Sequence, residues 1–136
     1  MMDDASNNLP QPSEEEVENF INAAVDDNTT GLITYLDKYG SAFVDIKYLN
    51  GCTALMWAGL MGRESAASLL LEKGADICVV DDGGRTALVC AEIGGDAGTV
   101  ALLKRKEQQM QNKLVEINLQ QLKQQRPNKS ILHKKL

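Results

Sequence analysis

Residues 53–58 read TALMWA, and residues 86–91 read TALVCA. The two stretches share four of their six residues and stand 33 positions apart. Between them, residues 64–73 form a second segment with helical spacing, which ends at Gly74, a residue type that commonly terminates helices. One short helical pattern written twice at a fixed interval predicts a stack of repeated helix pairs.

The segment between the two copies carries a more specific signal. Residues 62–64 read GRE, and residues 68–76 read SLLLEKGAD. Together with the 33-residue period, this pattern resembles the second helix and turn of an ankyrin repeat. The resemblance implies an all-α fold, in which helix-turn-helix repeats joined by short hairpin loops are followed by a C-terminal extension helix. It also implies a surface for binding another protein, since stacked repeats present a continuous face to a partner.

The pattern divides the chain into three parts. Residues 1–13 are interpreted as a disordered lead, residues 14–104 as the ankyrin-like repeat domain, and residues 105–136 as a basic, glutamine-rich C-terminal helix with a frayed end. The three repeats are placed at about 14–47, 48–80 and 81–104. Helices are expected at 14–25, 29–39, 54–61, 64–73, 87–93 and from 97 onward.

Local signals within the repeats support this division. Ser13 and Glu16 have the spacing of a capping box at the start of a helix. Apolar residues then recur at helical spacing and predict the buried stripes. In the first repeat they are Val17, Phe20, Ile21, Ala24, Leu32, Ile33 and Leu36. In the later repeats they include Ala54, Leu55, Ala58, Ala67, Leu70, Leu71, Leu88, Ala91, Val100 and Leu103.

The C-terminal segment departs from the repeat pattern. Where a Gly-Ala-Asp turn is due, residues 104–107 read KRKE, so the last outer helix is expected to run onward. Residues 107–125 carry two apolar spacings, each shorter than two heptads, whereas a coiled coil needs roughly three to four. This favours a helix that caps the open end of the third repeat over a helix that oligomerises the chain.

Charge is distributed unevenly. Residues 1–103 hold 17 acidic and 5 basic residues, a formal charge of −12, whereas residues 104–136 hold 2 and 9, a charge of +7. The basic segment has only three contiguous cations and no aromatic residues for base stacking, so we do not expect nucleic-acid binding. No apolar run approaches the roughly 18 residues that span a bilayer, and no membrane association is expected.

The sequence offers little for catalysis. Cys52, Cys78 and Cys90 are interpreted as reduced thiols that fill apolar space in an intracellular protein, either cytoplasmic or also nuclear. The single histidine, His133, lies far along the chain from every cysteine, so neither a metal site nor a Cys-His nucleophile pair is expected. Residues 94–98 are glycine-rich but lack the strand and lysine of a phosphate-binding loop, and no cofactor is expected. These observations predict that the chain is not an enzyme.

The resemblance places partner contacts just before each inner helix and at its end. These positions, with one inner-helix residue, are Leu49, Asn50, Trp57, Leu60, Met61, Asp82, Arg85 and Ile93. Trp57, Leu60 and Met61 are expected to form an apolar patch on the concave side, with Asp82 and Arg85 as its polar rim. Either a partner or the protein's own chain covers such a patch. The expected partner is another protein, and the free chain is expected to be monomeric. The alternative is a structural protein that oligomerises through its C-terminal helix.

Overall fold

The computed structural model describes residues 11–124, and this part of the chain is all-α, with no strand. Its α-helices are α1 (Glu14–Val25), α2 (Thr29–Tyr39), α3 (Ala54–Leu60), α4 (Glu64–Glu72), α5 (Ala87–Gly94) and α6 (Ala97–Gln124). Two 3-10 turns, η2 (Ser41–Asp45) and η3 (Leu49–Gly51), lie in the loop before α3. The predicted fold class is confirmed, and the helix bounds agree within one residue. Residues 1–10 of the expected lead and residues 125–136, which include the expected frayed end, lie outside the described residues.

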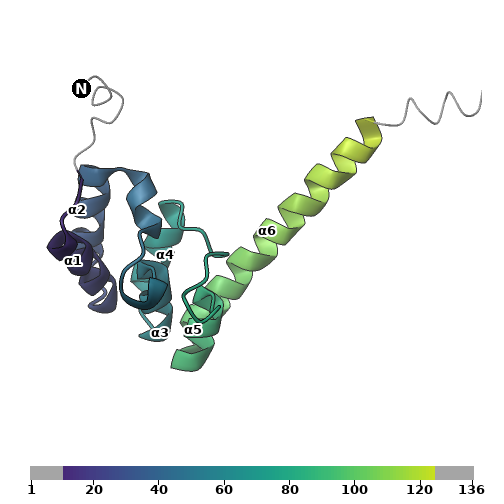
Figure 1. Ribbon diagram of the computed structural model, residues 1–136. Coiled ribbons are helices and arrows are strands. Elements are labelled where there is room, and N and C mark those ends of the chain that lie inside the picture. The colour runs from purple at the N-terminus through teal and green to yellow at the C-terminus, as the bar shows by residue number, and fades with distance from the viewer. Residues whose placement is uncertain (1–10, 125–136) are drawn as a thin grey trace, which may run out of the picture. The chain divides into compact units, whose positions relative to one another are not determined.

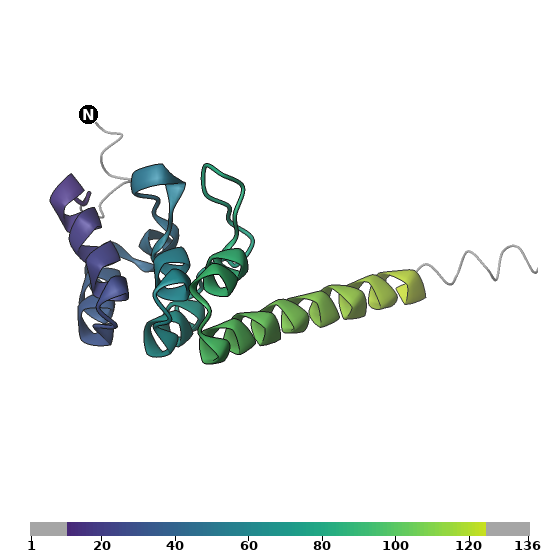
Figure 2. The same ribbon diagram turned by 90° about the horizontal axis from the view of Figure 1, so that it is seen from below.

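The helices of residues 11–104 are stacked in pairs (Figure 1). The inner helix α3 packs between α1 and α5, and the outer helices α2 and α4 pack on each other (Figure 2). The start of α6 takes the place of a third outer helix, because Gly98 lies against the carboxylate of Glu64 on α4. The hairpin loops before α3 and α5 emerge on the side of the inner helices. This arrangement leaves the tips of both hairpins beside the exposed side of α3 and α5.

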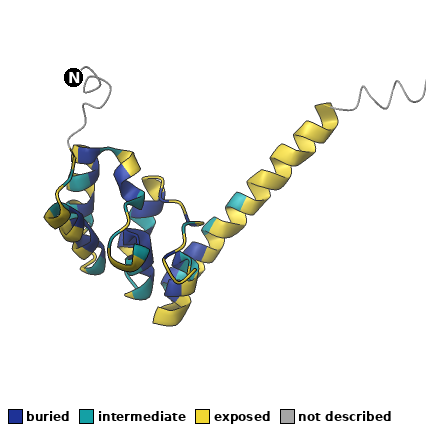
Figure 3. Cartoon of the chain, viewed as in Figure 1, coloured by how far each residue is buried: buried dark blue, intermediate teal, exposed yellow. Residues whose placement is uncertain are grey.

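The core of the stack lies where the helix pairs face one another (Figure 3). Each inner helix contributes small residues that allow a close approach, and α1 and α3 also bury large side chains that fill the space between repeats. The large side chains that are fully buried include Phe20, Leu32, Leu55, Met56, Leu70 and Leu103. Three residues of the expected stripes are not fully buried, because Ile33 on α2 is exposed, and Leu88 on α5 and Val100 on α6 are half-buried. Ile33 shares an apolar run with Leu32, but it lies on the side of α2 that faces an open groove beside α4.

Helix ends follow the expected local chemistry. Ser13 and Glu16 form the predicted capping box at the start of α1, with reciprocal backbone-to-side-chain hydrogen bonds of 3.1 Å. Gly74 follows α4 with a φ of 97°, a conformation that glycine adopts without strain because it has no β-carbon. The turn at Gly74 also lets Ala75 N donate to Leu70 O at 2.9 Å, which satisfies a carbonyl at the end of α4.

A polar bridge joins α1 to α2 in the first repeat. The Glu16 carboxylate accepts hydrogen bonds from the Tyr39 hydroxyl and from Lys38 Nζ, the latter at 3.0 Å. The bond from Tyr39, followed by that from Lys38, lowers the pKa of Glu16 to about 2. This carboxylate therefore stabilises the fold above its unfolded pKa of about 4.5, and that contribution is lost as the pH falls towards 2.

The variant Glu16→Gln should expose this pH dependence. Glutamine keeps the capping box but removes the charge, so the variant should melt a few degrees below the natural protein at pH 7. The difference between the two melting temperatures should close between pH 4.5 and pH 2, where the natural carboxylate becomes protonated. Thermal unfolding by circular dichroism across this range provides the measurement. Glu15→Gln removes the same charge in the same turn and serves as the control, and a gap independent of pH would contradict the prediction.

The described part divides into two compact units after Lys104, within α6. Residues 105–124 form one uninterrupted helix, in agreement with the expectation that the outer helix runs onward. Apart from the half-buried Lys106 and Met110, the side chains of this segment are exposed, including Leu114, Val115 and Ile117. No helix in the described range is both long and apolar enough to cross a membrane. The capping role and the oligomerising role of this segment both stay predictions.

Candidate functional site

The inner helices start at equivalent positions of successive repeats. Thr53 Oγ1 accepts a hydrogen bond from Met56 N, and Thr86 Oγ1 accepts one from Val89 N, each at 3.3 Å. These threonines are N-caps, so they satisfy a backbone N–H at the start of α3 and of α5. Each cap directly follows a hairpin, so each hairpin tip occupies the same position relative to the helix that it precedes.

Hydrogen bonds fasten the hairpin tips to each other. Asp82 N donates to Asn50 O at 2.9 Å, and Lys47 Nζ donates to Val80 O at 3.1 Å. Both bonds join positions about one repeat apart, so the tips of repeats two and three form one continuous edge. The predicted site residues Leu49, Asn50 and Asp82 lie on this edge and are exposed.

Asp81 organises the second tip from within. Its buried carboxylate accepts hydrogen bonds from Gly83 N, Arg85 N and Arg85 Nε, each at 2.9 Å. The backbone N–H of Arg85 makes the largest contribution to lowering the pKa of Asp81, so this group stays ionised. Residues 81–85 therefore form a tight turn around the Asp81 carboxylate. The Arg85 guanidinium is paired with a buried carboxylate, although its side chain is 51% exposed.

A small pocket of about 90 Å³ lies under this edge, between α3 and α5. Five of the eight predicted site residues line it, namely Asn50, Trp57, Leu60, Arg85 and Ile93. The other three, Leu49, Met61 and Asp82, are exposed and are not part of the lining. Cys52, another contact position that the resemblance implies, also lines the pocket, whereas sequence reasoning missed three lining residues, namely Met56, Asp81 and Cys90. The repeat period offered a signal for one of them, because Trp57 and Cys90 are 33 positions apart and neighbouring repeats place such residues side by side.

The three cysteines differ in their surroundings. Cys52 and Cys90 are buried in the pocket wall, and burial raises the pKa of both thiols, so they are protonated and unreactive near neutral pH. These two fit the expectation of apolar fillers. Cys78 does not, because it lies exposed in the loop after α4. All three are free thiols in the structure, and none of the described residues forms a group of three or more ligands able to hold a metal ion.

Trp57, which lines the pocket, has an indole N–H that no hydrogen bond within residues 11–124 satisfies. Its side chain is half-buried on α3, and its Nε1 atom is shielded from solvent. Among the described residues, this N–H has no hydrogen-bond partner. A buried donor without an acceptor is destabilising and is uncommon in folded proteins.

Comparisons with known proteins agree with the repeat pattern. A family model described as "Ankyrin repeat" matches residues 50–82, which run from the first hairpin tip to the second. The crystal structure of the human ASB11 ankyrin repeat domain superposes with a TM-score of 0.57 and 29% sequence identity. The match covers 63% of this chain and 38% of the human one. The chain is an ankyrin-repeat protein.

A probable palmitoyltransferase, AKR2 from Saccharomyces uvarum, is 40% identical over 53 residues of this ankyrin-repeat protein. The match covers 39% of the chain but only 7% of the yeast protein. So short a share assigns no transferase activity to the chain. Ankyrin repeats generally bind other proteins and rarely carry chemistry.

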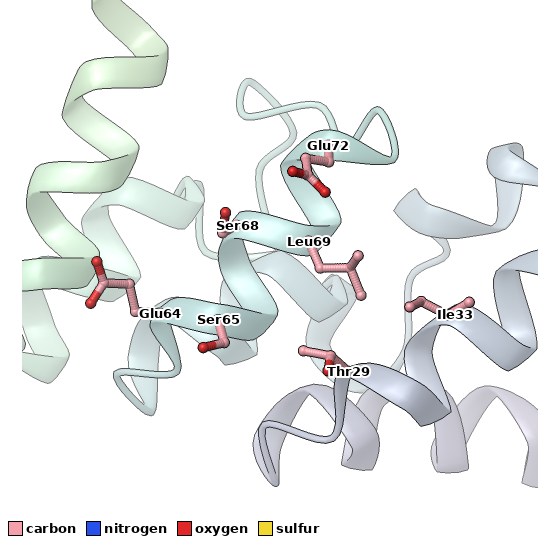
Figure 4. Close-up of a pocket in the computed structure, with 7 residues that line it drawn as sticks. All are labelled: Thr29, Ile33, Glu64, Ser65, Ser68, Leu69 and Glu72. Atoms are coloured by element: carbon pink, nitrogen blue, oxygen red, sulfur yellow. The ribbon is translucent and has the colours of Figure 1, made fainter.

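The outer side of the ankyrin stack carries a second depression (Figure 4). It is an open groove of about 480 Å³ between α2 and α4, with Ile33 and Leu69 on facing helices. Glu64 and Glu72 stand towards the two ends of α4, and Figure 4 shows the two apolar side chains between the helices. The groove is shallow and contains no buried polar group without a partner among the described residues. The pocket between α3 and α5 is therefore the better candidate site.

Proposed function

We propose that this ankyrin-repeat protein is a non-enzymatic binding module whose partner docks on its concave face. The concave face is the surface formed by the two hairpin tips and the exposed side of α3 and α5. The exposed apolar side chains at the C-terminal ends of α3 and α5 are the observation that carries the proposal: Met61 is 42% exposed and Ile93 is 57% exposed. Together with half-buried Trp57 and Leu60, they form an apolar centre beside the polar residues Asp82 and Arg85. This is the usual composition of a protein-protein contact.

The double variant Met61→Ser/Ile93→Ser tests this proposal by separating affinity from stability. Because both side chains are exposed, the melting temperature should change by no more than a few degrees. Binding to proteins captured from a cognate extract should weaken by at least about 1 kcal/mol for each side chain, as measured by calorimetry with the captured partner. Ile33→Ser, an exposed apolar change on the outer side, is the control and should leave binding unchanged. If only the control variant lost binding, the outer groove would be the binding site.

A structural role through the C-terminal helix is the second candidate. Within residues 105–124, the exposed side chains of Leu114, Val115, Ile117, Leu119 and Leu122 favour it, because apolar surface of this kind is commonly covered by another chain. Sedimentation of the free protein separates the two proposals. A monomer at micromolar concentration would favour the binding module, and a stable oligomer would favour the structural role. The odd number of free thiols supports a cytoplasmic location, with the nucleus as a second compartment.

A further inference from the structure

The pocket between α3 and α5 holds a donor that the protein itself leaves unused. Trp57 Nε1 is shielded from solvent and has no acceptor among the described residues. The carboxylate in the same lining, Asp81, already accepts three hydrogen bonds from Gly83 and Arg85. Because Nε1 is shielded even from water, a ligand must first displace the side chains that cover it. An acceptor brought to the indole N–H would then form a hydrogen bond without breaking one of the bonds described at this site.

The size of the pocket restricts what can enter. Its volume is about 90 Å³, whereas pockets for small molecules and cofactors run to roughly 300–1,000 Å³. There is room for one side chain inserted from a larger partner, with Leu60 and Ile93 as its apolar neighbours. A polypeptide can supply both the side chain that fills the pocket and the acceptor for the indole N–H, since each residue joins a side chain to a backbone carbonyl.

Charge further defines the partner. The cations of residues 11–103 are largely engaged within the fold: Lys38 pairs with Glu16, Arg85 pairs with Asp81, and Lys47 and Arg63 donate to backbone carbonyls. Residues 1–103 carry a formal charge of −12, and exposed carboxylates, Asp82 and Glu92, stand on the tip and on α5. A basic partner is therefore attracted to this face, and an acidic one is repelled.

We infer that the concave face binds a basic peptide segment of its partner, an inference that rests on the proposed function. The segment inserts one aliphatic side chain beside Leu60 and Ile93, and places a carbonyl oxygen on Trp57 Nε1. Lysine or arginine residues flanking the inserted side chain lie near Asp82 and Glu92.

A random peptide library displayed on phage, selected against the full chain, provides the probe. Enriched peptides should combine an aliphatic residue with lysine or arginine, and their affinity should fall as salt rises from 50 to 200 mM. Because Trp57 is the single tryptophan of the chain, its fluorescence reports binding at this site directly. Double variant Asp82→Asn/Glu92→Gln should weaken peptide binding several-fold. Glu72→Gln, on the outer helix α4, is the control for net charge and should have little effect.

The indole donor is tested by replacing Trp57 with benzothienylalanine, whose ring has the same shape but carries sulfur in place of N–H. Peptide binding should weaken by roughly ten-fold, the value of one hydrogen bond. The melting temperature should stay the same or rise, since the fold loses no bond. Equal affinity with the isostere would overturn the donor assignment, and enrichment of neutral or acidic peptides would overturn the basic partner.

Failure of the underlying function has a different signature. Peptides that bind equally well to Met61→Ser/Ile93→Ser would place the binding surface elsewhere, whatever their charge. A screen that enriches no peptide would count against both the binding surface and its basic ligand. Sedimentation tests another occupant, a second copy of the chain: a dimer that dissociates in the same double variant would replace the peptide.

Discussion

Shortening Leu55 to alanine is expected to lower the free energy of unfolding by about 2–5 kcal/mol. Leu55 is 1% exposed and lies on α3, the helix that packs between α1 and α5. Removing its isobutyl group takes away contacts on both sides of the central helix and leaves a cavity that a stack of short helices cannot easily close. For a repeat domain of this size, the loss corresponds to about 4–8 °C in melting temperature for each kcal/mol.

Leu49→Ala is the matched control for this prediction. It makes the same change of side chain six positions earlier, on a hairpin tip, where the leucine is 63% exposed. Its effect on the unfolding free energy should stay within about 0.5 kcal/mol. Urea denaturation of both variants measures the free energy of unfolding, and the midpoints can be compared directly if the m-value is unchanged. Equal losses for the two variants would mean that α3 is not the centre of the stack.

The repeat period made most of this fold predictable. The spacing of residues 53–58 and 86–91 predicted the stacked helix pairs, the capping box and apolar spacing predicted the helices of the first repeat, and glycine at position 74 marked the end of α4. These features are local, since each depends on residues within one helix or turn. The long α6 was also predictable, because residues 97–124 contain no proline, and no Gly-Ala-Asp turn follows Leu103.

The site was only partly predictable, because it depends on contacts between repeats. The resemblance identified Asn50, Trp57, Leu60, Arg85 and Ile93, which do line one pocket, but not the buried carboxylate of Asp81. Nothing in a single repeat shows that an aspartate among glycines turns inward to accept three N–H donors. The unpaired N–H of Trp57 is likewise a product of packing, since it depends on which acceptors the neighbouring hairpin has already used.

Composition misled the expectations at two places. Ile33 lies in an apolar run on α2 but faces outward, and Cys78 is a small apolar residue in an exposed loop. In both cases the residue type favours burial, whereas its position in the stack decides otherwise. Periodicity is a reliable guide on the central inner helix α3, which packs between α1 and α5. It is a weaker guide on the outer helices, which have one side open to solvent.

The second large effect is expected from Gly94→Ala at the end of α5. A β-carbon at this position would lie 2.2 Å from the carbonyl oxygen and 2.9 Å from the carbonyl carbon of Leu60. These are backbone atoms of α3, so the two inner helices would have to move apart. Overpacking of this kind costs about 1–3 kcal/mol, although alanine is otherwise the better residue for a helix.

Gly98→Ala provides the control, because the same change meets a different obstacle. There the added carbon would lie 2.7 Å from Oε1 of Glu64, the end of a flexible side chain that can turn aside. Alanine should therefore be neutral at position 98, or stabilising by up to about 1 kcal/mol. Chemical denaturation of the two variants measures the difference, and equal stabilities would contradict a tight contact between α3 and α5. Because Leu60 and Ile93 flank this contact, Gly94→Ala should also widen the pocket and weaken the selected peptides, whereas Gly98→Ala should leave their affinity unchanged.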